Sequence, residues 1–524
     1  MTDRWELVAK ATEFVAEEMG VALRRSALSP NIRERMDHSC AVLTEDTRIA
    51  AQAEHIPVHL GSFKVGTEKL FAWLAREAIP LNEGDMVVVN DPYVSGTHLN
   101  DVMILAPVFV NGVRRAHVVT KAHLVDVGGP APGSLNPDAR TLFGEGLVIP
   151  PTTLVRAGHV DTNVLRWLAA NFKDPSTALG DLHAEIAANR MGISRVASLF
   201  DRFGRRGVHE GWARSIDHTR MVVRRTLRTW KAGHHRAIDA MELHGSFLPV
   251  RLNLSITGTS VLADFRGSHA QVEAPINAVL GVTYSATAFA VRSALASEVP
   301  TNSGFYDCVR ILAPSGSIVN PTAPAPVSGG NVETTQRVAD VVLRALSHAL
   351  PGRIPAASAG TMMNVMLGGH RSSGSYWAYY ETIGGGTGGR ARSDGVSGVQ
   401  TNMTNTLNTP IEVAEREFPL FFTRYGLRRH SGGVGRHPGG EGIVRSFQVR
   451  SPTTLSLLAD RFLRGPWGLQ GGSPGSSGRA TIVRGKRRFV MPSKFVTELA
   501  AEDEVRLETP GGGGYGRPVP RRAT

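Results

Sequence analysis

The chain has 524 residues, of which 42% are hydrophobic and 20% are charged, the ordinary balance of a globular protein. A chain of this length exceeds what one hydrophobic core usually serves, so we expect several domains. The two cysteines, Cys40 and Cys308, exclude a disulfide framework and a cysteine-rich metal site. The N-terminus lacks a signal-peptide pattern and no apolar run is long enough to cross a bilayer, which predicts a soluble, cytoplasmic protein with no membrane partner.

The net charge is +12, and basic residues gather in 220–231, 486–488 and the C-terminal tail. A nucleic-acid-binding protein would also show a recognisable RNA-binding string or zinc-finger spacing, and the sequence has neither, so we predict no nucleic-acid partner. The basic runs fit a solvated helix face and a frayed tail. Attraction of an anionic substrate or an acidic partner stays open.

The first predicted elements are helices and a hairpin. Asp3 and Glu6 resemble a capping box, and the apolar residues that follow recur at helical spacing, which predicts a first helix ending near Arg25. The next segment predicts a hairpin that turns at Glu45-Asp46 and then an irregular loop. Residues 65–78 predict a second helix.

Three apolar runs then predict strands at 86–89, 102–110 and 113–120. Asn111-Gly112 separates the last two, and this dipeptide predicts a two-residue type I′ hairpin turn. Such a turn pairs Val110 with Val113, and counting back along the strands pairs Asp101 with Ala122. The register therefore brings the residues before 102 and after 120 to the open end of one hairpin.

Two His-x-x-Asp units lie at that open end, His98-Leu99-Asn100-Asp101 and His123-Leu124-Val125-Asp126. In extended strands, alternation of side chains puts His98 and His123 on one face and the two aspartates on the other. Gly96 and Gly128-Gly129 mark places where the chain can bend. Both units are therefore expected to meet in space.

The rest of the chain alternates between helical and strand patterns. Helices are predicted at 179–203, 210–231, 278–297 and 337–350, and strands at 247–258 and 259–268. Glycine-rich strings with strands follow. We predict a multi-domain α+β fold with mixed sheets, a helical N-terminal part and a glycine-rich, strand-rich C-terminal part. The expected domains are a metal-site domain (1–235), a central α+β domain (236–355) and a β-rich C-terminal domain (356–524).

The glycine-rich strings match no known phosphate-binding signature. None is a Walker-type loop, and none opens a dinucleotide-binding βαβ unit. Residues 384–389, GGGTGG, fit an anion cradle of backbone amides or a tight turn with close backbone approach. The sequence has no nucleophile elbow, and Cys40 fits a buried small residue.

Paired histidines and carboxylates indicate a transition-metal site, because Zn, Mn and Fe accept imidazole and carboxylate ligands together. The nearby carboxylates Asp101, Asp126 and Glu145 are the catalytic candidates, because a carboxylate can orient a histidine or act as a general base. The alternative is that each His–Asp pair is only a hydrogen-bonded contact at a strand end. Asp37, His59 and Glu145 lie in turn-rich segments, where each one alone fits a loop or cap residue.

Ordered motifs along nearly the whole chain resemble the hydantoinase B/oxoprolinase family. They include SPNIRERMDHSCAVL, AEHIPVHLGS, NDPYVSGTHLNDV, HLVDVGG, GEGLVIPP, PVSGGNVETTQRVAD, YYETIGGGTGG and TPGGGGYG. The resemblance implies a zinc or manganese ion held by His98 and His123, with Asp37 as carboxylate ligand and Asp101 and Asp126 close by. Two positions depart from the pattern of many members: Ala122 stands where they have a histidine, and Ser95 where they have a glycine.

The resemblance also implies a partner and a reaction. The partner is a hydantoinase A-type subunit that binds ATP, which makes the protein part of a hetero-oligomer. That subunit phosphorylates the carbonyl oxygen of a hydantoin or lactam, and metal-bound water in this chain then opens the ring. The alternatives are an α-type subunit of an ATP-dependent acetone or acetophenone carboxylase, and a non-catalytic assembly subunit.

Overall fold

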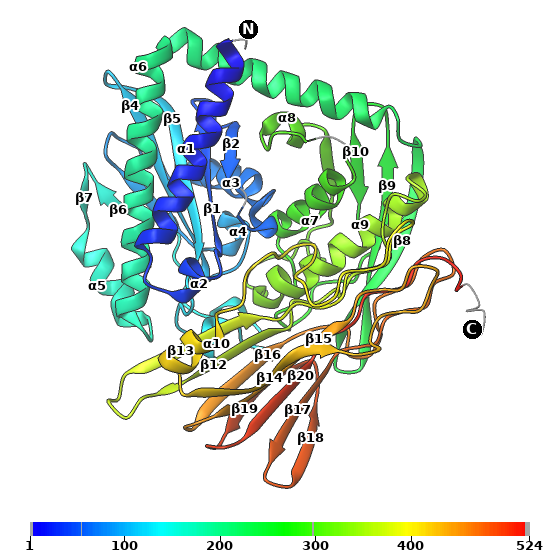
Figure 1. Cartoon of the computed structure of the whole chain (residues 1–524). Coiled ribbons are helices and arrows are strands. Elements are labelled where there is room, and N and C mark those ends of the chain that lie inside the picture. The colour runs from blue at the N-terminus through cyan, green and yellow to red at the C-terminus, as the bar shows by residue number, and fades with distance from the viewer. Residues whose placement is uncertain (1–3, 54, 296–297, 519–524) are drawn as a thin grey trace.

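The computed structural model describes residues 4–53, 55–295 and 298–518. The predicted cap Asp3 and the end of the basic tail lie outside these ranges. In the described part, helices and four sheets are arranged with most helices in the first two thirds of the chain and a strand-rich C-terminal part, as Figure 1 shows. The predicted α+β class, with a helical N-terminal part and mixed sheets, is confirmed.

The N-terminal sheet has seven strands in the order β2-β1-β5-β4-β3-β6-β7, and all of its neighbours are antiparallel. Its strands in chain order are β1 (His38–Thr44), β2 (Ile49–Ala53), β3 (Met86–Val89), β4 (Asp101–Val110), β5 (Val113–His123), β6 (Thr152–Arg156) and β7 (His159–Val160). The hairpins predicted at Glu45-Asp46 and at Asn111-Gly112 are both present.

Both faces of this sheet are buried, which explains why its strands read as continuous apolar runs. Along β3 and β4, Val88 and Ile104 enter one hydrophobic core, whereas Val87, Val89 and Leu105 enter another. One core is covered by α1 (Arg4–Ser26) and α6 (Pro175–Leu227), which lie side by side in Figure 1. The other core faces α3 (Ser62–Arg76) and the central unit of the chain.

Helix α6 joins the two helices predicted at 179–203 and 210–231. Between them only Gly204 leaves the helical region, with φ 71° and ψ 158°. Glycine adopts a positive φ without steric cost, so it breaks the helix at one residue and the chain resumes at once. The short helices of the N-terminal half are α2 (Pro30–Arg33), η1 (Pro57–His59), α4 (Pro92–Ser95), η2 (Pro132–Ser134), η3 (Leu142–Gly144) and α5 (Thr162–Asn171).

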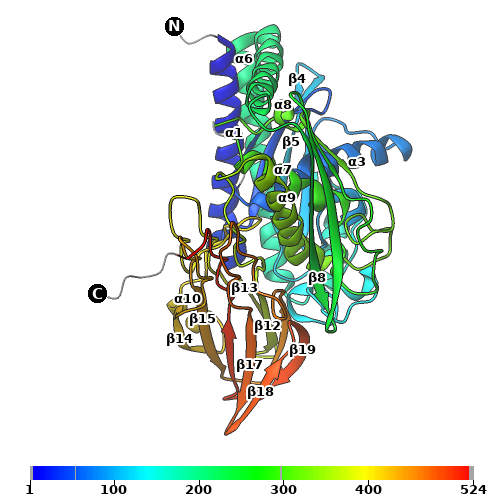
Figure 2. The same cartoon turned by 90° about the vertical axis from the view of Figure 1, so that its right-hand side faces the viewer.

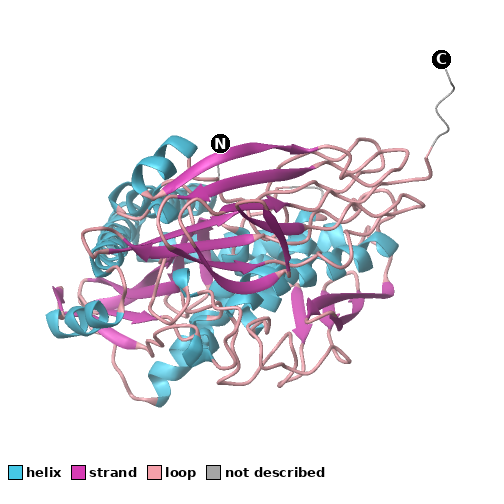
Figure 3. Cartoon of the chain, turned by 90° about the horizontal axis from the view of Figure 1, so that it is seen from below, coloured by secondary structure: helices cyan, strands magenta, loops and turns pink. Residues whose placement is uncertain are grey.

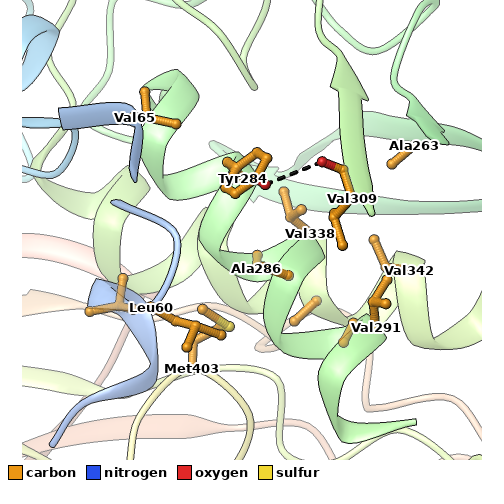
Figure 4. Close-up of a cluster of buried hydrophobic side chains, with 14 of the residues drawn as sticks. Leu60, Val65, Ala263, Tyr284, Ala286, Val291, Val309, Val338, Val342 and Met403 are labelled. Atoms are coloured by element: carbon orange, nitrogen blue, oxygen red, sulfur yellow. Dashed lines mark hydrogen bonds between the residues drawn. The ribbon is translucent and has the colours of Figure 1, made fainter. Parts of the chain in front are cut away.

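The central unit packs a four-stranded sheet, in the order β11-β10-β9-β8, against two helices. Its elements are β8 (Gly233–Leu243), β9 (Ser246–Ile256), β10 (Val261–Asp264), α7 (Leu280–Ser293), α8 (Ser303–Tyr306), β11 (Val309–Leu312), η4 (Gly330–Thr334) and α9 (Thr335–Ala349). Figure 4 shows Val338 and Val342 of α9 packed near Val291 of α7, with Tyr284 donating a hydrogen bond to the carbonyl of Val309 at 3.2 Å.

The C-terminal part is a sandwich of two antiparallel sheets, in the orders β13-β12-β16-β19 and β14-β15-β20-β17-β18. A third hydrophobic core fills the space between them. The elements are β12 (Asn364–His370), β13 (Tyr376–Thr382), α10 (Ile411–Glu417), β14 (Leu420–Arg428), β15 (Gly442–Val449), β16 (Thr453–Leu458), β17 (Arg479–Arg484), β18 (Arg487–Met491), β19 (Lys494–Leu499) and β20 (Glu504–Glu508). Figure 2 shows the sandwich below α1 and α9.

The glycine-rich strings pack against one another as extended backbone, among the loops drawn in pink in Figure 3. Gly512 N donates to Gly440 O, and Gly440 N donates to Thr387 O, both at 2.9 Å. Within GGGTGG, Gly385, Gly386, Thr387 and Gly389 donate their amides to backbone carbonyls of other segments. Most of the backbone amides are therefore occupied, which favours close backbone approach over an anion cradle.

Buried ion pairs connect the central unit to the sandwich. Arg461 lies 2.7 Å from both Asp239 of β8 and Asp340 of α9, and Arg337 of α9 lies 2.6 Å from Asp460. The boundary expected near residue 235 falls inside β8, and the one near residue 355 falls between α9 and β12. The three-domain division stays a prediction. Among the described helices, none combines the length and the apolar character that a bilayer span requires.

Candidate metal centre

The β4–β5 hairpin brings the two His-x-x-Asp units together in a register that differs from the predicted one. Asn111 and Gly112 both have positive φ, at 51° and 70°, as a type I′ turn requires. A bulge then follows, because Phe109 pairs with Arg114 but Val108 pairs with Ala116. Arg115 is thus an extra residue in β5, and Asp101 pairs with His123 in place of Ala122.

This one-residue shift corrects the predicted arrangement of side chains. The uninterrupted register put Asp101 on the face away from His123, and a shift by one residue brings the two to the same face. His98 reaches the same point because the chain turns before β4, which begins at Asp101, and the Asp101 amide donates to His98 O at 3.1 Å. Asp101 Oδ1 lies 3.0 Å from His98 Nε2 and 3.2 Å from His123 Nδ1, and the two ring nitrogens are 3.2 Å apart. Three atoms of the kind that bind metals therefore converge at the open end of the hairpin.

Two further residues flank this His98–Asp101–His123 cluster. His59 Nε2 lies 3.2 Å from Asp101 Oδ2, and the other ring nitrogen of His59 lies 3.1 Å from Ser39 Oγ. Because a carboxylate only accepts hydrogen bonds, His59 Nε2 is the donor to Asp101. Asp37 Oδ2 lies 3.9 Å from His123 Nδ1, so a second carboxylate lies close to the cluster.

Local backbone contacts hold the cluster in place. Asp91 caps the short helix α4, and Gly96 ends it with φ 86°, so the chain turns sharply into the segment that carries His98. Asn90 donates to Leu99 O at 2.8 Å. At the other strand, the His123 amide donates to Asp37 O at 3.1 Å. The backbone segments that carry both histidines are thus held by hydrogen bonds within the protein.

The cluster is deeply buried, with Asp101 1% and His98 0% exposed. Burial alone would raise the pKa of Asp101, but the His98 and His59 rings hold it well below its usual range. Burial lowers the pKa of the His123 ring, which keeps that imidazole neutral and able to donate a lone pair. Burial also lowers the pKa of Lys121 to about 8, although Asp101 opposes this shift.

The residues present fit a divalent transition ion. Two imidazole nitrogens and one carboxylate oxygen are ligands that Zn, Mn and Fe accept. The two ring nitrogens lie 3.2 Å apart and each lies within 3.2 Å of Asp101 Oδ1, so a cation between them is attracted by all three atoms at once. Asp37 can supply a fourth ligand atom, because no hydrogen-bond donor occupies its carboxylate in the described structure.

A small cavity of about 10 Å³, room for about one water molecule, adjoins the cluster. Its apolar lining comes from Ile56, Val58, Val332 and Met362. Its polar lining comes from Asp37, Asp101, His123, Asn331, Tyr380, Thr382, Thr404 and Thr406. The Tyr380 ring stacks on His123 with the ring centroids 5.0 Å apart. The cavity therefore lies between the N-terminal sheet and strand β13 of the sandwich.

Asp126 lies outside the cluster. Its carboxylate accepts hydrogen bonds from the amides of Gly128 and Gly133, at 2.8 and 3.0 Å, and lies 3.4 Å from Lys173 Nζ. Burial raises the pKa of Asp126, and Lys173 opposes that shift. These contacts hold the turn after β5 in shape, and the catalytic role of Asp126 stays a prediction.

Glu145 also lies apart from the cluster. Its Oε1 accepts hydrogen bonds from the amides of Val327 and Ser328, both at 2.8 Å, and it is fully buried. Burial raises the pKa of Glu145 from 4.5 to about 7, although those two amides oppose the shift. The side chain ties the loop after η3 to the segment before η4, and its catalytic role stays a prediction.

Glu145 should make the stability of the protein depend on pH. Because its pKa is raised in the folded state, its stabilising contribution is complete below pH 4.5 and is lost as pH rises through about 7. Glutamine at this position can still accept both amide hydrogen bonds but cannot ionise. We expect the free energy of unfolding of Glu145→Gln, relative to that of the wild type, to increase by roughly 2 kcal/mol between about pH 5 and pH 8. Urea denaturation of both proteins at both pH values measures this. The same difference in free energy of unfolding between the two proteins at both pH values would contradict this prediction.

Sequence patterns identified some of these residues and missed others. His98, Asp101, His123 and Asp37 were predicted, and the structure brings them together. His59 alone fitted a loop residue, yet it is fully buried against Asp101. The signal that could have found it is the pair of histidines in HIPVH directly before a predicted helix. Asn331, whose amide lies 3.5 Å from Asp101 Oδ2, was not singled out.

Relatives of the chain were found in sequence. A family model described as hydantoinase B/oxoprolinase matches residues 3–518. A protein of Methanocaldococcus jannaschii with no assigned function is 43% identical over 98% of this chain and 91% of its own length. 5-oxoprolinase 1 of Arabidopsis thaliana is 34% identical over 96% of this chain, which spans only 41% of the plant protein. A putative D-/L-hydantoinase component of the B type, from Pseudomonas sp. NS671, is 29% identical over 98% of this chain and 90% of that one.

Solved structures share the fold. An ATP-dependent caprolactamase from Pseudomonas jessenii aligns with a TM-score of 0.90 and 26% identity, covering 98% of this chain and 92% of that one. An acetone carboxylase structure aligns with a TM-score of 0.89 but 18% identity, covering 99% of this chain and 76% of that one, and it supports the fold alone. With a family model matched over nearly its whole length and 43% identity to a relative of similar length, the chain belongs to the hydantoinase B/oxoprolinase family.

Proposed function

We propose that the protein is the metal-bearing component of an ATP-dependent enzyme that hydrolyses a cyclic amide, such as a hydantoin or another lactam. The observation that carries the proposal is the buried His98–Asp101–His123 cluster beside a cavity. Similarity to an ATP-dependent caprolactamase over 98% of the chain supports the reaction class. The names of the 5-oxoprolinase and hydantoinase relatives agree with it.

The side chains of the site have distinct roles in this proposal. His98, His123, Asp101 and Asp37 hold the ion, which when bound supplies the Lewis acidity that polarises a carbonyl and lowers the pKa of water. His59 holds the second oxygen of Asp101 by donating a hydrogen bond to it. The apolar side chains of the cavity exclude bulk water, so charges inside it interact more strongly.

ATP-dependent activation is assigned to a second component. The sequence holds no Walker-type loop, one relative is named as one subunit of a hydantoinase, and the chain spans about two fifths of the plant 5-oxoprolinase. We place the counterpart of a separate ATP-binding subunit in the part of that longer relative that this chain does not match. The protein therefore acts in a hetero-oligomer, and the activated substrate reaches the cavity from the partner.

A carboxylase of the acetone type is the second candidate, favoured by the shared fold with acetone carboxylase. Both candidates use ATP and the same cluster, but a carboxylase consumes bicarbonate. A third reading, a non-catalytic assembly subunit, fits poorly with a complete and buried cluster of ligand atoms.

The test is an assay of the chain with and without its ATP-binding partner. We expect the chain alone to release no ADP and to open no ring, and the complex to release ADP when a hydantoin or lactam is added. The panel should include ketones, with and without bicarbonate. Ring opening by the chain alone would contradict the division between two components, and ketone- and bicarbonate-dependent ADP release would favour the carboxylase.

A further inference from the structure

The cavity beside the metal cluster is too small for a cyclic amide. Its volume is about 10 Å³, which leaves room for about one water molecule. Sites that bind small molecules usually enclose roughly 300 Å³ or more. A hydantoin or lactam therefore cannot reach the cluster while the cavity keeps this shape, and part of its wall has to move.

Most of the wall is fixed by strand pairing or by packing. Asp101 and His123 face each other on the paired strands β4 and β5, and the His123 amide donates to Asp37 O at 3.1 Å. The apolar residues of the wall belong to one hydrophobic core: Ile56, Val58, Val332 and Met362. Asn331 lies beside Val332 in η4, which continues directly into α9. Moving any of these residues would disrupt a sheet or a core.

Strand β13 supplies another fixed part of the wall through Tyr380 and Thr382. It pairs with β12 along its whole length. Arg35, which is 1% exposed and comes from the N-terminal half, donates to the Tyr380 carbonyl at 3.0 Å and to Thr382 Oγ1 at 3.1 Å. The strand is therefore bound both to its own sheet and to the N-terminal half.

Thr404 and Thr406 form the remaining part of the wall, and they lie in the irregular segment between β13 and α10. Both are buried, at 3% and 4% exposure, whereas Asn405 between them is exposed and Leu407 is 52% exposed. The side chains therefore alternate between the cavity and solvent, as in an extended chain. A single layer of chain separates the cavity from solvent here. We call residues 404–408 the strap.

The backbone of the strap is weakly held. In the described structure, the amides of residues 405–408 donate no hydrogen bond to a protein atom, and the Thr404 amide reaches Thr401 O only at 3.5 Å. The residues on either side are firmly packed, with Met403 0% and Thr409 2% exposed. Local opening is easiest where backbone hydrogen bonds within the protein are few, so the strap can move between two fixed ends.

Side-chain hydrogen bonds keep the strap closed. Thr406 Oγ1 lies 2.7 Å from Thr382 Oγ1 and 3.4 Å from Arg35 Nη2. Asn408 donates to Thr382 O at 2.8 Å and accepts a hydrogen bond from the Tyr425 hydroxyl at 3.0 Å. Each bond of this kind contributes only about 1 kcal/mol to stability. Breaking them therefore costs less than unfolding the protein.

We propose that the strap opens to admit the cyclic amide to the metal centre and closes behind it. The proposal rests on the proposed function, which sets the size of the ligand. Opening separates Thr406 and Asn408 from β13, while β13 stays attached to Arg35. Closure excludes bulk water from the cluster, so that charges inside it interact more strongly.

The test is the rate at which a chelator removes zinc from the full-length, zinc-loaded chain, because an enclosed ion leaves only when its site opens. Thr382→Cys/Thr406→Cys replaces two hydroxyls 2.7 Å apart by thiols within reach of a disulfide. We expect zinc release from the oxidised variant to be at least about tenfold slower than from the same variant after reduction. A thiol count shows whether the bond forms, and its failure to form would contradict the contact between the strap and β13.

Asn408→Ala tests the strap without a new bond. It removes both hydrogen bonds of the Asn408 side chain and leaves the lining of the cavity intact. We expect zinc to leave this variant roughly tenfold faster than the wild type. Thr257→Cys/Ser260→Cys is the matched control for oxidation, because these hydroxyls lie 3.2 Å apart in the turn between β9 and β10 and do not line the cavity. Its zinc release should be the same before and after oxidation.

Equal zinc release from the oxidised and reduced forms of the Thr382→Cys/Thr406→Cys variant, or wild-type release from Asn408→Ala, would overturn the strap. Hydrogen exchange of the peptide 403–409 is a second readout that needs no metal, and oxidation of the same variant should slow it. Neither readout depends on ring opening. A strap that behaves as expected in an enzyme that opens no ring would therefore contradict the proposed function alone.

Discussion

Replacing His98 or His123 by alanine should remove the metal ion from the protein and abolish the activity of the assembled enzyme. Each imidazole supplies one of the three ligand atoms that meet within hydrogen-bonding distance in the described part of the chain. Loss of either one leaves a single histidine with carboxylates, a set that holds transition ions less tightly. The measurement is elemental analysis of the purified variants, where the wild type should carry about one ion per chain and each variant close to none.

The same two variants should also be less stable in the metal-free form. Asp101 is fully buried, and His98 and His59 favour its charged state. Removing one partner of a buried charge typically costs about 3–5 kcal/mol. We therefore expect a lower denaturation midpoint for His98→Ala even in the presence of a chelator, which separates the effect on the cluster from the loss of the ion.

His117→Ala is the control for these variants. His117 is also buried on β5, where it contacts Thr44 O at 3.3 Å, but it takes no part in the cluster. It should keep the metal while losing a comparable amount of buried surface. Full metal occupancy in both His98→Ala and His123→Ala would show that the cluster does not bind the ion.

The position of the cluster was predictable, but its exact composition was not. Asn111-Gly112 is a strong local signal, and it brought the two His-x-x-Asp units together as expected. The bulge at Arg115 has no glycine or proline beside it in β5, and Pro107 in the partner strand β4 is the one local signal for it. A shift of one residue exchanges the faces of the strand. The sequence therefore predicted a meeting of His98 and His123 and wrongly turned Asp101 away from them.

The rest of the site depends on contacts between segments far apart in the sequence. His59 reaches Asp101 across 42 residues, and Arg35 reaches Thr382 across 347. No local pattern encodes such distances, because they follow from how the sheets and the sandwich pack together. The sequence did not predict strand β8 for the same reason. Its aspartate Asp239 is typical of a surface position, but in the structure it is buried and pairs with Arg461, which lies 222 positions later in the chain.

The glycine-rich strings are the part of the fold where one methyl group should matter most. A Cβ at Gly512 would lie 1.9 Å from Thr387 O and 2.3 Å from its carbonyl carbon, both of which belong to the backbone. Neither atom can move without disturbing hydrogen bonds between the neighbouring glycine segments. We expect Gly512→Ala to destabilise the protein by at least about 3 kcal/mol, measured as a fall in the denaturation midpoint, because overpacking against fixed backbone cannot relax.

Gly426→Ala distinguishes crowding from a general effect of glycine substitution. Gly426 lies in strand β14, and a Cβ there would meet nothing within 4 Å. Alanine also loses less conformational entropy on folding than glycine, so this variant should lie within about 0.5 kcal/mol of the wild type or slightly above it. If Gly512→Ala were as stable as Gly426→Ala, the segments around Thr387 and Gly440 would have to be loosely packed. Close backbone approach would then not be the reason for their glycines. A large loss at Gly512 and none at Gly426 would show that these glycines are required because the backbones touch.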